Sequence, residues 1–296
     1  SLPPAMLILI VHALTFAVGL PANVFTIATL LAKIRRHRPR PHLTAADLLL
    51  LHLTTADLLL LLFLPFKMAE AAAGMEWPFP TVLCPIANFC FFSSIYLSTL
   101  FMAALGVERY FGVAHPHRYG RRRRLWRTAV ASAVLWVLAL SHCSVVFVAE
   151  YHRNPTETQP HSAFRCYDDF SAAQLRFVLP LRLELCLVLY LLPFAVTVFC
   201  YVRLIRALLP RPHIPREKKY RTVGLAVATV VNFGVCFAPY NLSHVVGFVQ
   251  QRSPEWRPYA LILTTLSAAL DPFIFYFSSS AVRMAVGGVV GAVRGQ

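Results

Sequence analysis

Five side chains that can bind an anion lie within or beside strongly apolar stretches of this sequence. They are two arginines, two histidines and a tyrosine: Arg182, Arg257, His142, His244 and Tyr240. A guanidinium can hold a carboxylate through two parallel hydrogen bonds, and imidazole and phenol groups can add more. Tyr240 and His244 are four residues apart, so they share one face of a helix. Together the five predict a site for a small acidic ligand.

Three of these residues also have a simpler interpretation without a ligand. Arg257 could extend its charged end to the lipid headgroups. Glu184 could neutralise Arg182, although residues two apart on a helix do not face each other. A single histidine such as His142 is more often a hydrogen-bonded core residue. Their joint occurrence at one depth favours an anion site.

The elements that must position these residues are apolar enough to lie in a membrane. Of the 296 residues, 57% are hydrophobic and 14% are charged, whereas a soluble domain has ~25% charged residues. Stretches long enough to cross ~30 Å of hydrocarbon occur at residues 7–31, 44–72, 84–113, 127–151, 175–209, 220–249 and 256–278. Residues 279–296 are better interpreted as a short amphipathic helix on the membrane surface. The predicted fold is an all-α membrane protein, with a seven-transmembrane helix bundle over 1–278 and a surface helix over 279–296.

The positive charge predicts the orientation of the chain. Lys and Arg number 28 against 13 Asp and Glu, a net charge of +15. Twenty of the 28 lie near the ends of spans one, three, five and seven: Lys33, Arg35, Arg36, Arg38 and Arg40; Arg118, Arg121, Arg122, Arg123, Arg124 and Arg127; Arg203, Arg206, Arg211, Arg216, Lys218, Lys219 and Arg221; Arg283 and Arg294. Basic residues accumulate in cytoplasmic loops, which places the N-terminus outside and the C-terminus in the cytoplasm. Anionic membrane lipid, and not nucleic acid, is the expected partner of these charges.

Two of the seven cysteines are predicted to form a disulfide. Five lie within spans and are interpreted as small buried hydrophobic residues. Cys84 lies at the outer end of span three, and Cys166 lies in the loop between spans four and five. Both face the oxidising side of the membrane, where a disulfide is stable. Their bridge would hold the loop 152–174 over the mouth of the bundle.

Ionisable residues also lie in the inner half of the spans, where they are costly and usually functional. They are Asp57, Asp271, Glu108 and Arg109. Two carboxylates brought together would bind a cation or share a proton. Glu108 and Arg109 could also simply reach the lipid headgroups.

A set of short motifs, in order along the chain, resembles the rhodopsin-like G-protein-coupled receptors. The motifs are Gly19-Leu-Pro-Ala-Asn23, Leu53-Thr-Thr-Ala-Asp57, Glu108-Arg109-Tyr110, Trp136, Pro193 with Tyr201, Phe233, Cys236-Phe237-Ala238-Pro239 and Asp271-Pro272. The resemblance implies a plasma-membrane receptor that activates a heterotrimeric G protein, with Gi/o, Gq and arrestin as candidate partners.

The same resemblance implies roles for individual residues. Arg109 would pair with Glu108 at rest and meet the G protein on activation, and Pro239 would kink span six so that its inner half swings outward. The other residues of the implied switch are Tyr110, Tyr201, Phe233 and Phe237. The implied sodium pocket consists of Asp57, Ser98, Ser267 and Asp271, and this allosteric Na⁺ is the only cofactor expected.

Three positions depart from the common pattern of the family. Phe237 stands where many relatives have Trp, Asp271 replaces the usual Asn, and Phe275 occupies a Tyr position with Tyr276 one residue later. The last departure puts the usual tyrosine contact at the inner end of span seven in doubt.

Longer phrases resemble the free fatty acid receptors for short-chain carboxylates. They are Leu179-Pro-Leu-Arg-Leu-Glu-Leu185, Ala238-Pro-Tyr-Asn-Leu-Ser-His-Val-Val-Gly247, Ser141-His-Cys143, Ser93-Ser-Ile-Tyr96 and Asp271-Pro-Phe-Ile-Phe-Tyr-Phe-Ser-Ser-Ser280. The resemblance implies that Arg182 and Arg257 hold the carboxylate, that His244 and Tyr240 add hydrogen bonds, and that His142 shapes the cavity. The expected lining is Phe89, Phe92, Tyr96 and Glu184. Some phrases are closer to the type-2 receptor and others to type 3, and the choice stays open.

Other functions are weighed against this one. The ligand could be a hydroxy acid or a longer fatty acid. A monocarboxylate transporter would also use intramembrane arginines, but it predicts internal repeats and broken helices. The common nucleophile, zinc and phosphate-loop motifs do not occur in the sequence, so an enzyme is not expected.

Overall fold

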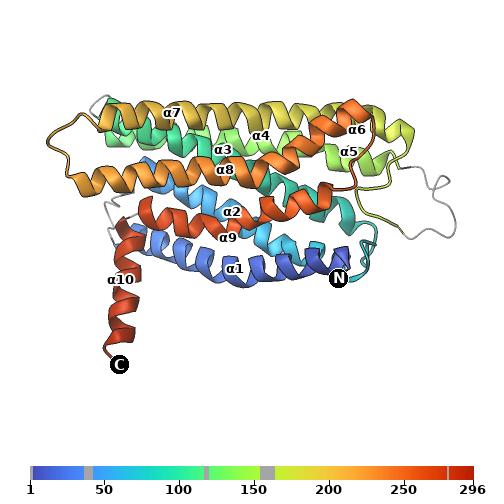
Figure 1. Cartoon of the computed structure of the whole chain (residues 1–296), viewed down its shortest axis with the longest axis horizontal. Helices are drawn as coiled ribbons and strands as arrows, with labels where there is room; N and C mark the ends of the chain where they lie inside the picture. The colour runs from blue at the N-terminus through green and yellow to red at the C-terminus, as the bar shows by residue number, and fades with distance from the viewer. Residues whose placement is uncertain (1–2, 37–42, 117–119, 154–163, 279) are drawn as a thin grey trace.

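The computed structural model describes residues 3–36, 43–116, 120–153, 164–278 and 280–296, and its regular elements are helices (Figure 1). They are α1 (Pro4–Arg36), α2 (Ala45–Ala72), α3 (Leu83–Ala114), α4 (Arg121–Cys143), α5 (Val145–Tyr151), α6 (Ala172–Cys186), the π-helical turn η1 (Leu187–Leu191), α7 (Leu192–Leu208), α8 (Arg216–Gln250), α9 (Arg257–Ser278) and α10 (Ser280–Arg294). The basic residues Arg38, Arg40 and Arg118, which contribute to the predicted orientation, lie outside the described residues.

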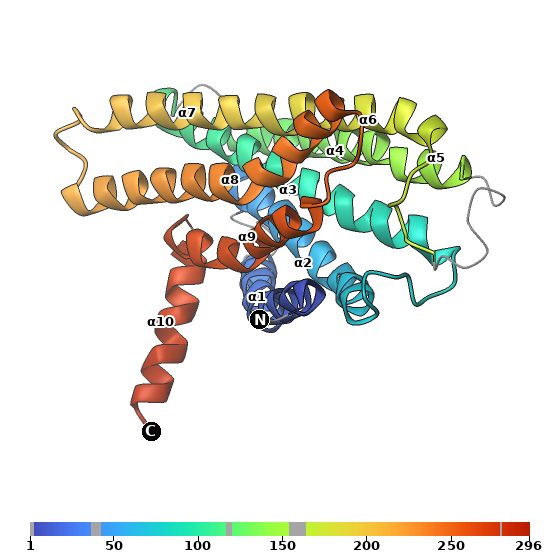
Figure 2. The same ribbon diagram turned by 45° about the vertical axis from the view of Figure 1, so that its right-hand side comes forward.

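The predicted seven-helix membrane fold is confirmed. Seven helical segments of the described residues are long and apolar enough to cross a membrane. The fourth predicted span consists of α4 and α5, which are separated at Ser144, and the fifth consists of α6, η1 and α7. The helix predicted to follow the bundle is α10, and in Figures 1 and 2 it leaves the bundle at the end opposite the N-terminus.

The helices lie side by side, and α3 is the most deeply buried of them. Its side chains from Phe91 to Ala103 are all buried, polar ones included. In a bilayer each helix satisfies its own backbone hydrogen bonds, so the bundle needs only side-chain contacts to assemble. A central α3 can therefore contact both the outer and the inner functional regions.

The N-terminus of α2 is fixed by the carboxylate of Asp47. The Oγ1 of Thr44 accepts a hydrogen bond from the backbone N–H of Asp47, and the Asp47 carboxylate accepts one from the N–H of Thr44. This reciprocal pair is a capping box, which satisfies two of the free donors of a helix end. Lys33 of α1 adds an ion pair of 2.6 Å to the same carboxylate. Asp47 is thus a structural residue that ties α1 to α2.

The π-helical turn η1 interrupts the fifth span at mid-length. Here the backbone carbonyl of Leu189 accepts a hydrogen bond of 2.7 Å from the hydroxyl of Thr99 on α3. Such wide turns insert one residue into a helix and change the face that the following residues present. The contact with Thr99 fixes this turn against the centre of the bundle.

Candidate functional site

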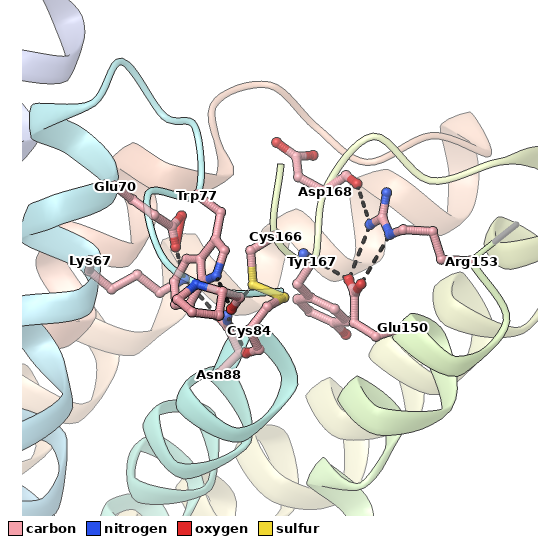
Figure 3. The surroundings of a disulfide bond; sticks show 11 residues. Lys67, Glu70, Trp77, Cys84, Asn88, Glu150, Arg153, Cys166, Tyr167 and Asp168 are labelled. Carbon is pink, nitrogen blue, oxygen red and sulfur yellow. Dashed lines mark hydrogen bonds and ion pairs between the residues drawn. A yellow bond between two sulfur atoms is a disulfide. The ribbon is translucent and has the colours of Figure 1, made fainter. Parts of the chain in front are cut away.

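The loop segment 164–170 lies over the end of the bundle at which α3 begins (Figure 3). The predicted disulfide between Cys84 and Cys166 is confirmed, and it ties the loop to the start of α3. On the other side, the Glu150 carboxylate accepts a hydrogen bond of 2.9 Å from the N–H of Tyr167, and Arg153 donates one of 2.8 Å to the carbonyl of Asp168. The segment is held from both sides, so the ring of Tyr167 has a defined place.

Arg182 of α6 lies under this segment and is 2% exposed. Its Nη1 donates a hydrogen bond of 3.1 Å to the hydroxyl of Ser253. Its guanidinium carbon lies 4.9 Å from the ring centre of Tyr167 and 5.2 Å from that of Phe170. Nε and Nη2 have no hydrogen-bond partner among the described residues. Since α6 is capped by Ser171 and Gln174, the helix that carries this cation is well anchored.

Arg257, the first residue of α9, approaches the same tyrosine ring. Its guanidinium carbon lies 5.5 Å from the ring centre of Tyr167, 5.2 Å from that of Phe92 and 5.3 Å from that of Tyr240. Its Nη2 donates a hydrogen bond of 3.0 Å to the Tyr240 hydroxyl, while Nε has no partner among the described side chains and backbone groups. The two predicted arginines are therefore brought together around Tyr167.

Below the arginines, α3 and α8 contribute an aromatic floor. His244 Nε2 and the hydroxyl of Tyr96 are 3.0 Å apart, and His244 Nδ1 has no partner in the described part of the chain. The Tyr240 ring stacks on Phe92 with centroids 6.1 Å apart and meets His244 edge-on at 4.8 Å. Four of the residues predicted from the sequence thus lie in one buried layer.

Three predicted residues lie elsewhere. His142 Nε2 and the Glu184 carboxylate are 3.0 Å apart, with the two side chains 19% and 47% exposed, and His142 Nδ1 lies 2.8 Å from the Leu138 carbonyl. Glu184 therefore pairs with His142 instead of lining the arginine site, because residues two apart on α6 point in different directions. Phe89 packs on Phe147 of α5, with centroids 5.0 Å apart.

The sequence reasoning missed a third cation, Lys67 of α2. Its Nζ donates a hydrogen bond of 2.7 Å to Asn88 and lies 3.6 Å from the Glu70 carboxylate (Figure 3). Lys67 and Glu70 line a cavity of about 660 Å³ that also reaches Tyr167 and Arg257. The rule applied to the arginines would have found Lys67, since it too is a charged residue in an apolar span.

The four residues of the implied sodium pocket lie in two hydrogen-bonded groups, one of which is bridged by Asn232. Ser98 donates a hydrogen bond of 3.0 Å to Asp57, and Asn232 joins Asp271 at 3.1 Å and Ser267 at 3.2 Å. Each carboxylate keeps one buried oxygen, Oδ2, without a partner among the described residues. Carboxylate and hydroxyl oxygens are the ligands of hard cations, so this set fits a small cation. Asn232 is a member that the sequence did not indicate.

The acid and the arginine of the Glu-Arg-Tyr motif have partners that differ from those expected. The Glu108 carboxylate forms an ion pair with Arg124 of α4, and Arg124 Nη2 also donates a hydrogen bond of 3.2 Å to the Glu108 carbonyl. Arg109 Nη1 instead donates one of 2.6 Å to the hydroxyl of Tyr201. The expected pair of Glu108 with Arg109 is replaced because α4 begins close enough to α3 to supply another arginine. Tyr110 packs against Phe111.

Aromatic rings connect two residues of the implied switch, Phe233 and Phe237, to α7. Phe233 contacts Phe237 of the same helix with centroids 5.7 Å apart, and Phe194 of α7 at 5.3 Å. Phe237 is 1% exposed, and Pro239 lies inside α8 two residues later. The proline kink therefore adjoins a packed aromatic cluster that links α7 to α8.

Comparisons with known proteins match this architecture. The family model described as 7 transmembrane receptor (rhodopsin family) matches residues 22–275. The chain is 45% identical over 287 residues to "Free fatty acid receptor 2" of Rattus norvegicus, covering 95% of this chain and 84% of the relative. It is 48% identical over 270 residues to "Free fatty acid receptor 3" of Mus musculus, covering 91% and 82% respectively. "Free fatty acid receptor 1" of Macaca fascicularis is 34% identical over 284 residues, covering 93% and 91%.

These relatives are receptors, which confirms the expectation that the chain is not an enzyme. The family match covers most of the bundle, and the confirmed disulfide and the seven spans agree with it. This chain belongs to the rhodopsin family of seven-transmembrane G-protein-coupled receptors and resembles free fatty acid receptors 2 and 3.

Proposed function

We propose that this receptor is activated by short-chain fatty acids such as acetate, propionate and butyrate, with the carboxylate held between Arg182 and Arg257. The observation that carries the proposal is the pair of arginines around the Tyr167 ring, with Arg182 Nε and Nη2 and Arg257 Nε buried without a partner among the described residues. A buried donor without an acceptor is costly, and a carboxylate supplies two acceptors. The names of the relatives, free fatty acid receptors 2 and 3, support a fatty acid as the ligand.

The aromatic floor under the arginines supports a short acyl chain. Phe92, Tyr96 and Tyr240 are 4%, 1% and 2% exposed. Burial of each added methylene gains only ~0.8 kcal/mol, which does not offset the displacement of packed rings. A ligand the size of acetate is limited to roughly 6 kcal/mol at ~1.5 kcal/mol per heavy atom, so its affinity should be weak.

Signalling and placement in the cell form the second part of the proposal. The receptor lies in the plasma membrane with its N-terminus outside and α10 in the cytoplasm. It activates a heterotrimeric G protein of the Gi/o class, with Gq and arrestin as further partners to be tested. The described basic segment between α7 and α8 lies at the end of the bundle opposite the N-terminus (Figure 1), which supports this orientation. The carboxylates of Asp57 and Asp271 would hold Na⁺, whose role there would be to neutralise two buried acids.

The test is to replace Arg182 or Arg257 with Ala and to measure G-protein activation by propionate at matched surface expression. Each variant should lose most of its response, because each removes half of the carboxylate site. Arg176→Ala, an exposed arginine on the same helix as Arg182, and Arg252→Ala in the loop before α9 are the matched controls. A full propionate response from both site variants would refute the proposal.

Other ligands and a transport function are tested in the same cells. A panel of C1 to C8 acids, with hydroxy acids added, distinguishes short-chain acids from hydroxy or longer acids. Labelled-acetate uptake into vesicles distinguishes a receptor from a monocarboxylate transporter, since only a transporter would accumulate the label.

A further inference from the structure

A long apolar groove lies on the side of the bundle, away from the proposed acid site. It has a volume of about 700 Å³ and is lined by residues of α2, α3, α4, η1 and α7. Ala103, Val107, Leu135 and Val196 are among its apolar walls. Its charged and titratable lining residues come from the last turns of α3 and the first turns of α4: Glu108, His115, Arg124 and Arg127. The groove is therefore amphipathic along its length.

The dimensions of the groove fit one leaflet of a bilayer. Arg124 and Leu138 of α4 both line it, and at ~1.5 Å per residue they are about 21 Å apart along the helix. One leaflet, with its headgroup region included, is about 20–22 Å thick. An acyl chain that enters beside Arg124 could follow the groove towards the middle of the membrane.

The charges at the entrance favour an anion. Two arginines stand against one carboxylate, and the Arg124 and Glu108 side chains are 27% and 16% exposed. On the proposed orientation this entrance lies in the cytoplasmic leaflet, which is rich in anionic phospholipid. Basic pockets between transmembrane helices on this side bind such headgroups.

We propose that this groove is a binding site for an anionic phospholipid of the inner leaflet. The phosphate binds Arg124 and Arg127, and one acyl chain lies along the apolar walls. A headgroup phosphate and the Glu108 carboxylate are alternative partners for the same guanidinium, because Arg124 already forms an ion pair with Glu108. Lipid binding therefore competes with the Glu108–Arg124 ion pair. Because the coupling is reciprocal, a change that weakens this ion pair should raise the affinity for the lipid.

The experiment measures binding of palmitoyl-oleoyl phosphatidylserine to the purified full chain without any short-chain acid, with phosphatidylcholine and sodium oleate as separate competitors. Arg124→Gln should lower the phosphatidylserine affinity about fivefold, and Glu108→Gln should raise it by a similar factor. Ala131→Phe, which fills the groove without changing its charge, should also weaken binding. The matched control is Arg123→Gln, one residue away on α4 but outside this groove, and it should bind like the wild type.

Several results would overturn the site. One is that phosphatidylcholine or oleate displaces the bound phosphatidylserine as well as phosphatidylserine itself does. The others are that Arg123→Gln loses as much phosphatidylserine affinity as Arg124→Gln, or that Glu108→Gln gains none. The thermal unfolding midpoint of each variant identifies loss of fold, and Glu108→Gln is a gain that misfolding cannot produce. Because the direct binding measurement contains no short-chain acid, its failure leaves the proposed carboxylate site untouched, and failure of the propionate test leaves this lipid site untouched.

Discussion

The guanidinium of Arg257 donates a hydrogen bond of 3.0 Å to the hydroxyl of Tyr240 and also lies over that tyrosine's ring. Arg257 is thus positioned by α8 although it belongs to α9. A ligand bound to Arg257 would therefore act on the part of α8 that follows Pro239. The arginine and the proline kink are connected through one side chain.

Tyr240→Phe should therefore weaken the response to propionate while leaving its maximum unchanged. Removing the hydroxyl leaves Arg257 Nη2 without its partner, and a hydrogen bond to a charged group contributes roughly 1.5–3 kcal/mol. We expect the half-maximal concentration to rise about tenfold or more in a G-protein activation assay. Tyr151→Phe, a tyrosine that is 87% exposed, is the control. An unchanged half-maximal concentration would show that this bond does not position Arg257.

Glu150→Gln should loosen the loop segment that carries Tyr167. The Glu150 carboxylate holds the Tyr167 N–H and forms an ion pair of 3.0 Å with Arg153. We expect the propionate concentration for half-maximal response to rise roughly threefold to tenfold, with surface expression retained because the disulfide remains. Glu76→Gln, an exposed acid of the same outer surface, should have no effect. A wild-type response would mean that the disulfide alone positions the ring.

Asp57→Asn should remove the dependence of basal activity on sodium. With one of the two buried carboxylates made neutral, the charge that favours a cation is halved. We expect basal G-protein activation by the purified receptor to be the same in sodium chloride and in N-methylglucamine chloride, whereas the wild type responds to the exchange. Asp169→Asn, in the outer loop, should behave like the wild type. Retained sodium dependence in Asp57→Asn would contradict the cation site.

Lys67→Met should destabilise the receptor by leaving the acid of a buried pair uncompensated. Glu70 is 5% exposed and lies 3.6 Å from Lys67, and breaking such a pair on one side costs about 3–5 kcal/mol. The thermal unfolding midpoint should fall in Lys67→Met and recover in the double variant with Glu70→Leu. Lys218→Met, on the exposed start of α8, is the control. Equal destabilisation by the single and double variants would show that packing of Lys67, and not its charge, is what matters.

The fold could be predicted from the sequence because hydropathy alone identifies segments that must satisfy their own backbone in lipid. All seven spans were located, but the break at Ser144 and the turn η1 were not. A local interruption does not lower the mean hydropathy of a span. The turn also depends on a hydroxyl from α3, which no pattern within the fifth span could reveal.

The site could be predicted only in part. The arginine pair was found because charged side chains are unusual within an apolar span, whereas the lining residues Phe92 and Tyr96 were named beside the family resemblance. The partners of Glu108 and Glu184 were not, because their carboxylates bind side chains from α4. Which of several nearby cations an acid meets depends on how two helices approach each other, and span positions do not contain that information.

The wide turn η1 also decides how the two ends of the fifth span are aligned. Arg182 and Tyr201 are 19 positions apart, so on an uninterrupted α-helix they would point about 100° away from each other. The wide turn takes up one extra residue, so the two positions are separated by the equivalent of about 18 residues of α-helix, or about five full turns. Arg182 and Tyr201 therefore both face the interior, and each is 2% exposed. One inserted residue thus places Arg182 and Tyr201, the partner of Arg109, on the same face of the fifth span.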